Sequence, residues 1–148
     1  GPGDYAASLR ARTIDIGGLN HNYPGDQWHF ALSKIVLTCR AFGLRPIDGA
    51  FDNFKDHKSY IASAKRAAAI GFEGKWAIHP SQIEHANKVF RPQKDEVVKA
   101  KKIINELTKI KKSSKGVAQL DGKMIDTASV RMAENIIKIN NLIKNKNK

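Results

Sequence analysis

The sequence of 148 residues contains little cysteine and no long apolar run. Its single cysteine, Cys39, excludes a framework of intrachain disulfides. No apolar stretch approaches the roughly 20 residues that a membrane-spanning helix needs, and no secretory signal opens the sequence. From these absences we expect a cytoplasmic protein without a membrane partner.

Motifs of several common sites are also missing. There is no glycine-rich phosphate loop, and no motif combines a nucleophilic side chain with a general base. Four histidines, His21, His29, His57 and His85, have no spacing typical of metal ligands. Cys39 belongs to an apolar helical pattern, which favours a packing role.

Positive charge is present in excess and is unevenly distributed. The formal net charge is +12; residues 1–92 carry 12 basic and 8 acidic side chains, and residues 93–148 carry 14 and 6. A basic surface attracts nucleic acid or a phosphorylated cofactor, but a solvated, lysine-rich helix face is the simpler interpretation. A nucleic-acid-binding module is therefore an alternative. It is disfavoured because the basic third after Pro92 contains no Trp, Tyr or Phe.

The stretch from Gly71 to Gln82 predicts a helix end, a strand and a helix start within a dozen residues. The strand is expected at Lys75–Ile78. Pro80 cannot continue a central strand but suits the first turn of a helix, which we expect to reach about Phe90. This order is typical of a repeating β/α architecture, in which polar groups at the carboxyl ends of the strands face a ligand.

Upstream of this stretch, the pattern predicts a helix over 28–42 that Asp26 can cap, because apolar residues recur at helical spacing. A short strand and turn over 44–49 place Asp48 at the strand's carboxyl end. Asp56 is a plausible N-cap for the next helix, and Gly71 ends that helix. The polar loop over 13–26 is of a length that is commonly functional.

Beyond Pro92 the residue pattern predicts helices and no strands. A long amphipathic helix is marked by Val97, Ala100, Ile104 and Leu107, a polar linker follows over 111–117, and a last helix begins near Asp126. Two complete β/α units and one truncated unit precede this end. A (β/α)8 barrel needs about 250 residues, so this chain is too short to form one. Two strands alone would leave open sheet edges, and we therefore expect the chain to be part of a larger fold.

Four motifs resemble those of the malyl-CoA lyase and citrate lyase β-subunit-like family, in the HpcH/HpaI aldolase superfamily. They are GDYAAS at 3–8, PIDG at 46–49, GFEGKWAIHPSQ at 71–82 and LDGKMID at 120–126. The glycine pair at 17–18, followed by DQWH at 26–29, is similar to the malyl-CoA lyase branch in particular. The resemblance spans essentially the whole sequence.

The resemblance implies an α/β fold, the C-terminal portion of a (β/α)8 TIM barrel with a helical C-terminal extension. Residues 1–92 would run from the end of strand six through helix eight. Residues 93–148 would form the extension and carry a catalytic aspartate to a neighbouring subunit of a homo-oligomer, a trimer or hexamer. A second metal carboxylate and an arginine of the family would lie upstream and are absent here.

The implied activity is cleavage of malyl-CoA to acetyl-CoA and glyoxylate, with Mg2+ as cofactor and Mn2+ as a substitute. Asp4 matches a metal ligand, and it directly follows a glycine-rich turn, as a ligand at the end of a strand does. Without the motif, a turn aspartate would be the simpler interpretation. Asp126 matches the residue that handles the proton of the acetyl-CoA enolate, although it also stands where an N-cap belongs.

Residues near the barrel mouth would line the channel for the acyl-CoA, partly through backbone groups: Asp48, Gly49, Ile78, His79 and Pro80. For His79, a hydrogen bond that holds the loop is an equal alternative. Citramalyl-CoA cleavage and thioester hydrolysis of malyl-CoA are alternatives within the same family.

Overall fold

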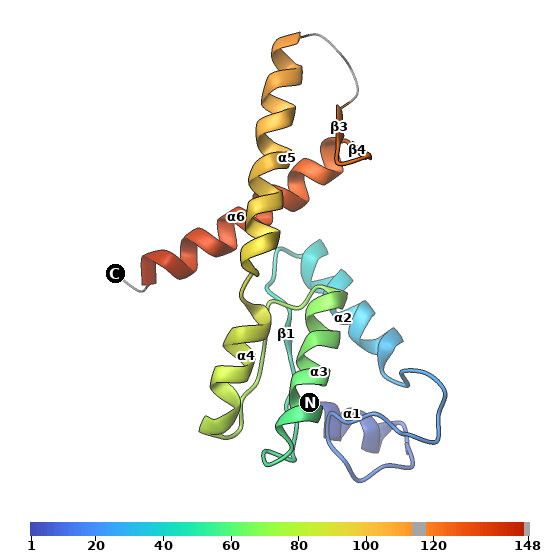
Figure 1. The fold of residues 1–148 in the computed structure, drawn as a ribbon. Helices are drawn as coiled ribbons and strands as arrows, with labels where there is room; N and C mark the ends of the chain where they lie inside the picture. The colour runs from blue at the N-terminus through green and yellow to red at the C-terminus, as the bar shows by residue number, and fades with distance from the viewer. Residues whose placement is uncertain (114–117, 147–148) are drawn as a thin grey trace. The chain divides into compact units, whose positions relative to one another are not determined.

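The computed structural model describes residues 1–113 and 118–146. The chain divides into two compact units, Gly1–Phe90 and Arg91–Lys148, which we call the first and the second unit (Figure 1). Within the described residues, no helix combines the length and the apolar character needed to cross a membrane.

The first unit alternates helices with two short parallel strands. Its helices are α1 (Pro2–Ser8), α2 (His29–Ala41), α3 (His57–Ile70), the 3-10 helix η1 (Pro80–Gln82) and α4 (Ile83–Phe90). Strand β1 (Ile47–Asp48) pairs in parallel with β2 (Gly74–Lys75), so that Ile47 is opposite Gly74 and Asp48 is opposite Lys75. The predicted order strand, helix, strand, helix is confirmed as β1, α3, β2 and α4.

Helix α3 is bounded as the sequence predicts. The Asp56 carboxylate accepts a hydrogen bond from the Ser59 backbone N–H at 3.0 Å, which satisfies one of the free donors at the helix start. Gly71 ends the helix at φ 115°, a left-handed conformation that glycine adopts without a Cβ clash.

Two predictions on element boundaries are wrong. Strand β2 ends at Lys75. The Trp76 N–H makes a last bond to the Asp48 carbonyl of β1, whereas the Ile78 N–H donates to the Gln82 side chain instead of a neighbouring strand. Asp26 is not the N-cap of α2. It accepts from the Trp28 N–H at 2.9 Å and pairs with Arg66 of α3 at 3.2 Å, while Trp28 itself is the cap.

Asp4 also lies in a different element from the expected one. It belongs to the first turn of α1, not to a turn that follows a strand.

The core of the first unit lies between α3 and the two strands. Tyr60, Ala64 and Ala67 of α3 are buried, and the Tyr60 ring meets the Phe51 ring edge-on at 6.1 Å. Small alanines let the helix approach the sheet closely. Helix α2, in contrast, has no buried residue; Phe30 and Leu37 on the helix and Phe42 at its C-cap are exposed. A single layer of helix and a two-stranded sheet cannot cover that apolar face.

The second unit consists of two long helices and a hairpin. Helix α5 (Lys94–Ser113) and helix α6 (Thr127–Lys146) pack on each other and cross in Figure 1. Strands β3 (Ala118–Leu120) and β4 (Lys123–Ile125) pair antiparallel. Ala100 and Ala133 are buried, and Ile125 and Val130 form an apolar cluster with Ile103 and Leu120.

The hairpin was not among the elements predicted from the sequence, although its signal is local. Asp121 and Gly122 both adopt positive φ, 50° and 74°, the conformation of a two-residue hairpin turn for which Asp-Gly is a strong marker. The start of the predicted linker is also different, because α5 continues to Ser113. Residues 114–117 of that linker, and the side chain of Leu107, lie outside the described residues.

Candidate active site at the carboxyl ends of the two strands

The carboxyl ends of β1 and β2 meet at one edge, because parallel strands point the same way. The segments 49–56 and 76–79 leave the strands there. Helix α1 begins at the same edge: a Cβ on Gly49 would lie 2.7 Å from Cδ of Pro2, so only glycine fits. The fold thus gathers Gly49, the loop with Ile78 and His79, and the first turn that carries Asp4.

Asp48 is tied to its neighbour strand by a buried ion pair. Its Oδ2 lies 2.6 Å from Lys75 Nζ, which also donates to the Gly49 carbonyl at 3.0 Å. The other oxygen, Oδ1, accepts from the Gly49 N–H at 2.8 Å. Only 2% of the Lys75 side chain and 10% of the Asp48 side chain are exposed. The hydrogen-bonding capacity of the Asp48 carboxylate is therefore used within the protein. Lys75 was not predicted as its partner from the sequence.

The ion pair faces α3. Lys75 Nζ lies 5.9 Å from the centre of the Tyr60 ring. Burial lowers the pKa of the Lys75 ammonium, an effect that the Asp48 carboxylate opposes. Burial also raises the pKa of the Tyr60 hydroxyl, and the Asp48 charge adds to that rise. Ile47, one residue earlier on β1, is exposed on the other face, as the alternation of a strand requires.

A buried glutamine fixes the loop that follows β2. Gln82 is 1% exposed; its Oε1 accepts from the Ile78 N–H at 2.8 Å, and its Nε2 donates to the Phe51 carbonyl at 3.0 Å. One amide thereby joins the loops that follow both strands. Gln82 was not predicted as a site residue, since nothing local distinguishes it from a surface glutamine.

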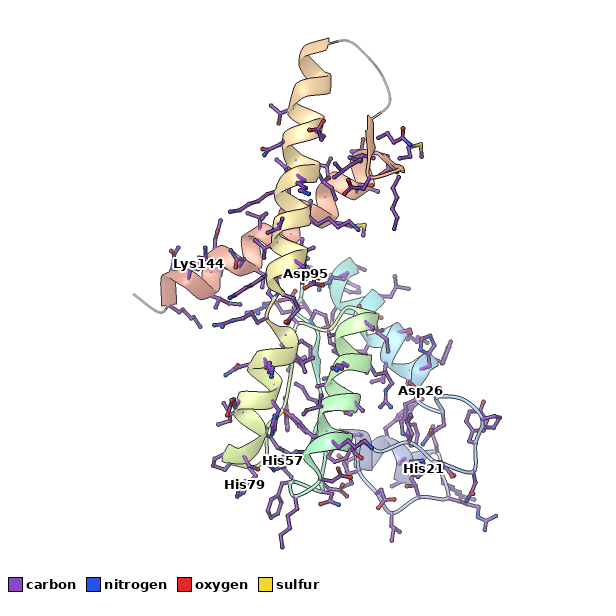
Figure 2. All side chains as sticks on the ribbon, in the orientation of Figure 1. His21, Asp26, His57, His79, Asp95 and Lys144 are labelled. Carbon is purple, nitrogen blue, oxygen red and sulfur yellow. The ribbon has the colours of Figure 1, made fainter. Side chains whose placement is uncertain are left out.

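His79 has the contacts of a residue that holds its loop, and its ring is also exposed. The ring stacks on Phe54, with centroids 4.4 Å apart, and its Nδ1 accepts from the Ser81 N–H at 3.2 Å. Pro80 follows as the first residue of η1. His79 and His57 lie at the same end of the first unit in Figure 2.

Asp4 is exposed on the first turn of α1. A carboxylate oxygen is the donor that Mg2+ prefers, so the residue fits as one ligand. Among residues 1–113 and 118–146, no group of three or more His, Cys, Asp or Glu side chains is arranged to hold a metal ion.

Asp126 belongs to the second unit and caps α6. Its Oδ1 accepts from both the backbone N–H and the hydroxyl of Ser129, each at 2.8 Å. These hydrogen bonds lower the pKa of the exposed Asp126 carboxyl. The cap that the sequence analysis weighed as the alternative is thus present, and both bonds fall on one of the two oxygens.

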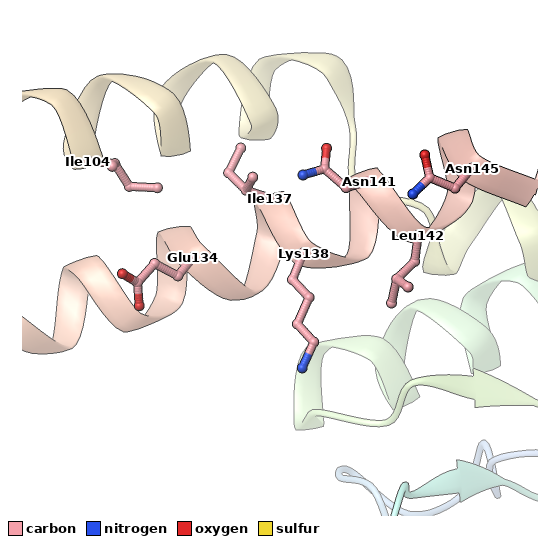
Figure 3. Close-up of a pocket in the computed structure, with 7 residues that line it drawn as sticks. All are labelled: Ile104, Glu134, Ile137, Lys138, Asn141, Leu142 and Asn145. Carbon is pink, nitrogen blue, oxygen red and sulfur yellow. The ribbon is translucent and has the colours of Figure 1, made fainter.

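The second unit also has an open groove of about 400 Å3 between its two helices (Figure 3). It is lined by Ile104 of α5 and by six residues of α6: Glu134, Ile137, Lys138, Asn141, Leu142 and Asn145. Its lining contains none of the predicted site residues.

The profile of the HpcH/HpaI aldolase/citrate lyase family matches residues 1–80. The chain is 40% identical, over 93% of its length and 46% of the relative's, to the L-malyl-CoA/beta-methylmalyl-CoA lyase of Rhodobacter capsulatus. It is 35% identical, over 79% of its length and 35% of the relative's, to the mitochondrial citramalyl-CoA lyase of Rattus norvegicus. The chain spans about half the length, or less, of these curated relatives.

A solved structure is also similar to the chain. The protein CitE from Mycobacterium tuberculosis, in complex with magnesium, acetoacetate and coenzyme A, matches with a TM-score of 0.72 and 25% identity, over 92% of this chain and 48% of that one. A citrate lyase from Burkholderia xenovorans LB400 matches with a TM-score of 0.78 over 97% of this chain and 45% of that one; at 22% identity, this likeness concerns the fold alone.

Proposed function

The chain belongs to the HpcH/HpaI aldolase/citrate lyase family, and from this membership we infer that it forms the carboxyl-terminal part of a Mg2+-dependent acyl-CoA lyase. The reaction is the reversible cleavage of malyl-CoA to acetyl-CoA and glyoxylate. The observation that carries this proposal is the 40% identity to an L-malyl-CoA/beta-methylmalyl-CoA lyase across 93% of the chain. The parallel β/α units of the first unit would be the last part of a (β/α)8 barrel.

Asp4 would be one of the carboxylate ligands of the metal ion. Its exposed position on the first turn of α1, at the carboxyl edge of the strands, supports this role. When bound, Mg2+ would act as a Lewis acid and as a template for the oxo acid. A second carboxylate would come from a part of the protein outside this chain.

Asp126 would handle the proton of the acetyl-CoA unit. Cleavage of the C–C bond produces glyoxylate and the enolate of acetyl-CoA, whose carbon then takes up a proton. In the condensation direction the carboxylate is the required form, and the hydrogen bonds from Ser129, which lower the pKa of Asp126, favour it. For the cleavage direction, the carboxyl must hold the proton, and burial in the site of a neighbouring subunit would raise its pKa.

The loops at the strand ends would line the channel for the acyl-CoA. Because the Asp48 carboxylate is paired with Lys75, it would act through the position of the Gly49 backbone and not through direct contact. Ile78, His79 and Pro80 would present the exposed edge of the second loop, which Gln82 and Phe54 hold in place.

The intact protein would be a homo-oligomer, a trimer or hexamer, in the cytoplasm. The exposed apolar residues of α2 support the idea that further protein covers this unit. Asp126 is exposed at the start of α6, the position that delivery to a neighbouring subunit would require.

The test is product analysis with the intact protein, malyl-CoA and Mg2+. Lyase activity releases acetyl-CoA and glyoxylate in equal amounts, whereas thioester hydrolysis releases malate and free CoA. Equal release of acetyl-CoA and glyoxylate, abolished by a chelator, would support the proposal. Malate with free CoA would overturn it in favour of the thioesterase alternative.

A second candidate is cleavage of citramalyl-CoA. It is favoured by the similarity to the rat citramalyl-CoA lyase and by 32% identity to the malyl-CoA/beta-methylmalyl-CoA/citramalyl-CoA lyase of Chloroflexus aurantiacus, over 99% of this chain and 45% of that protein. Comparison of kcat/KM for the two thioesters separates the candidates, because specificity is the ratio of these constants.

A further inference from the structure

Two histidines that the proposed function does not use meet between α3 and α4. His57 is the first residue of α3, and His85 is the third residue of α4. The distance from His57 Nδ1 to His85 Nε2 is 3.1 Å, and the ring centroids are 4.8 Å apart with the planes tilted by 58°. The residues are 28 positions apart, so no local spacing could reveal the pair.

Both histidines stand on rigid supports. The start of α3 is held by the Asp56 cap, and α4 follows η1, whose Gln82 is buried and bonded to both strand-end loops. Helices α3 and α4 pack side by side (Figure 1). His57 is exposed and His85 is half-buried, so solvent reaches the pair. Donor groups held on packed helices are the kind of preorganised arrangement that a metal site needs.

The spacing of the two nitrogens suits a shared metal ion. With metal–nitrogen bonds of about 2.0–2.1 Å, donors 3.1 Å apart subtend an angle of about 100° at the metal. That angle lies between the values of octahedral and tetrahedral coordination. Each neutral ring would offer its facing nitrogen to the metal ion and carry its proton on the other ring nitrogen. Each metal–nitrogen bond would lie about 40° from the line that joins the two nitrogens, so both rings would turn from the hydrogen-bonded orientation, and water would occupy the other positions.

We propose that His57 and His85 form a two-histidine site for one divalent transition-metal ion of the Cu2+, Ni2+ or Zn2+ type. Imidazole nitrogen suits these ions, whereas Mg2+ prefers oxygen, so the site is distinct from the proposed magnesium site at Asp4. A bound ion would join α3 to α4. These helices follow the loops that hold Phe54 and His79, so the ion would brace the candidate active-site edge.

The experiment titrates Zn2+, and separately Cu2+, into the metal-free intact protein in the presence of excess Mg2+. Calorimetry gives the stoichiometry and affinity, and electron paramagnetic resonance of the Cu2+ complex counts the coordinated nitrogens. We expect one tight equivalent with two nitrogen ligands. His57→Gln and His85→Gln should each weaken the affinity at least as much as the loss of an outer-shell partner does, about 10- to 100-fold. His21→Gln, at an exposed loop histidine, is the matched control and should change nothing.

Several outcomes would overturn the site. These are the absence of a one-equivalent binding step, unchanged affinity in both pair variants, or a Cu2+ spectrum without two nitrogens. In that case the pair is a hydrogen bond between helices and no more. The spectrum of the unsubstituted protein decides the matter even if a variant folds poorly. None of these readouts uses turnover, so failure of the proposed lyase activity would not affect them.

Discussion

Two helices, one in each unit, begin with the same local chemistry. At α3, Asp56 accepts from the Ser59 N–H, and its carbonyl accepts from the Tyr60 N–H at 3.1 Å. At α6, Asp126 accepts from the Ser129 N–H, and its carbonyl accepts from the Val130 N–H at 3.2 Å. In both cases hydrogen bonds from the serine lower the pKa of an exposed carboxyl.

The difference between them lies outside the cap. Asp56 leads into a helix whose next turn, with Tyr60, is buried in its own unit. Asp126 directly follows strand β4 of the hairpin, as the last residue of the LDGKMID motif, and only that motif assigns it a catalytic role. Because Asp56 has the same cap bond and the same lowered pKa, neither feature tests the catalytic role proposed for Asp126. A pair of matched substitutions tests it.

The largest expected effect is that of Asp126→Asn on turnover. General acid–base groups contribute about 100- to 10,000-fold, so kcat should fall within that range while KM changes little. Asp56→Asn is the matched control and should leave kcat near the unsubstituted value. Asparagine caps a helix about as well as aspartate, so both variants should unfold at nearly the parent temperature. Steady-state kinetics and thermal unfolding measure both quantities.

Subunit mixing sharpens the same comparison. If Asp126 acts in a neighbouring subunit, mixed oligomers of Asp126→Asn and Asp4→Asn chains contain some sites with both residues intact. At a Mg2+ concentration too low for Asp4→Asn alone to turn over, activity should therefore partly return. Confirmed mixed oligomers without any activity would place Asp126 in its own subunit's site or outside catalysis.

The next effect concerns the buried pair of the first unit. Lys75→Met leaves the Asp48 carboxylate buried without its countercharge, and breaking such a pair costs about 3–5 kcal/mol of unfolding free energy. The double variant Asp48→Asn/Lys75→Met should recover much of the loss, because asparagine still accepts from the Gly49 N–H. Denaturant unfolding measures both. Equal losses in the single and double variants would show that the charge is not the cause.

A smaller effect is expected for Asp4→Asn, because it removes one charged oxygen ligand and leaves a neutral one. The Mg2+ concentration at half-maximal activity should rise by at least about 10- to 100-fold, the cost typical of weaker changes around a metal. Asp15→Asn, an exposed aspartate of the neighbouring loop, is the control. An unchanged Mg2+ requirement would remove Asp4 from the metal site.

The smallest effect should appear at Glu73, which accepts from both Arg40 and Arg45. Burial alone would raise the pKa of this carboxyl, but the two guanidinium groups lower it overall from 4.5. A lowered pKa adds stability above the unfolded value, and this stability is lost as pH falls below about 4.5 through the folded value. Since both arginines are exposed, the contribution should stay under about 1 kcal/mol. Glu73→Gln should flatten the unfolding free energy in that pH window; an unchanged pH profile would contradict this assignment.

The sequence by itself determined the features that depend on neighbouring residues. The caps at Asp56 and Asp126 and the left-handed end at Gly71 are local, because the groups that bond each other are three or four positions apart. The hairpin turn at Asp121 and Gly122 is equally local, and the sequence analysis overlooked it. The motif order also sufficed for the family, which the profile match shows.

The tertiary structure alone decided which distant residues meet. Asp48 and Lys75 are 27 positions apart, Phe51 and Gln82 are 31 apart, and the histidine pair is 28 apart. Each contact depends on the register of the parallel strands and on the packing of α3 against α4, which residue patterns along the chain do not specify. For the same reason β2 stops at Lys75: the Ile78 N–H, which the apolar run assigned to a strand, is bonded by the buried Gln82 amide instead.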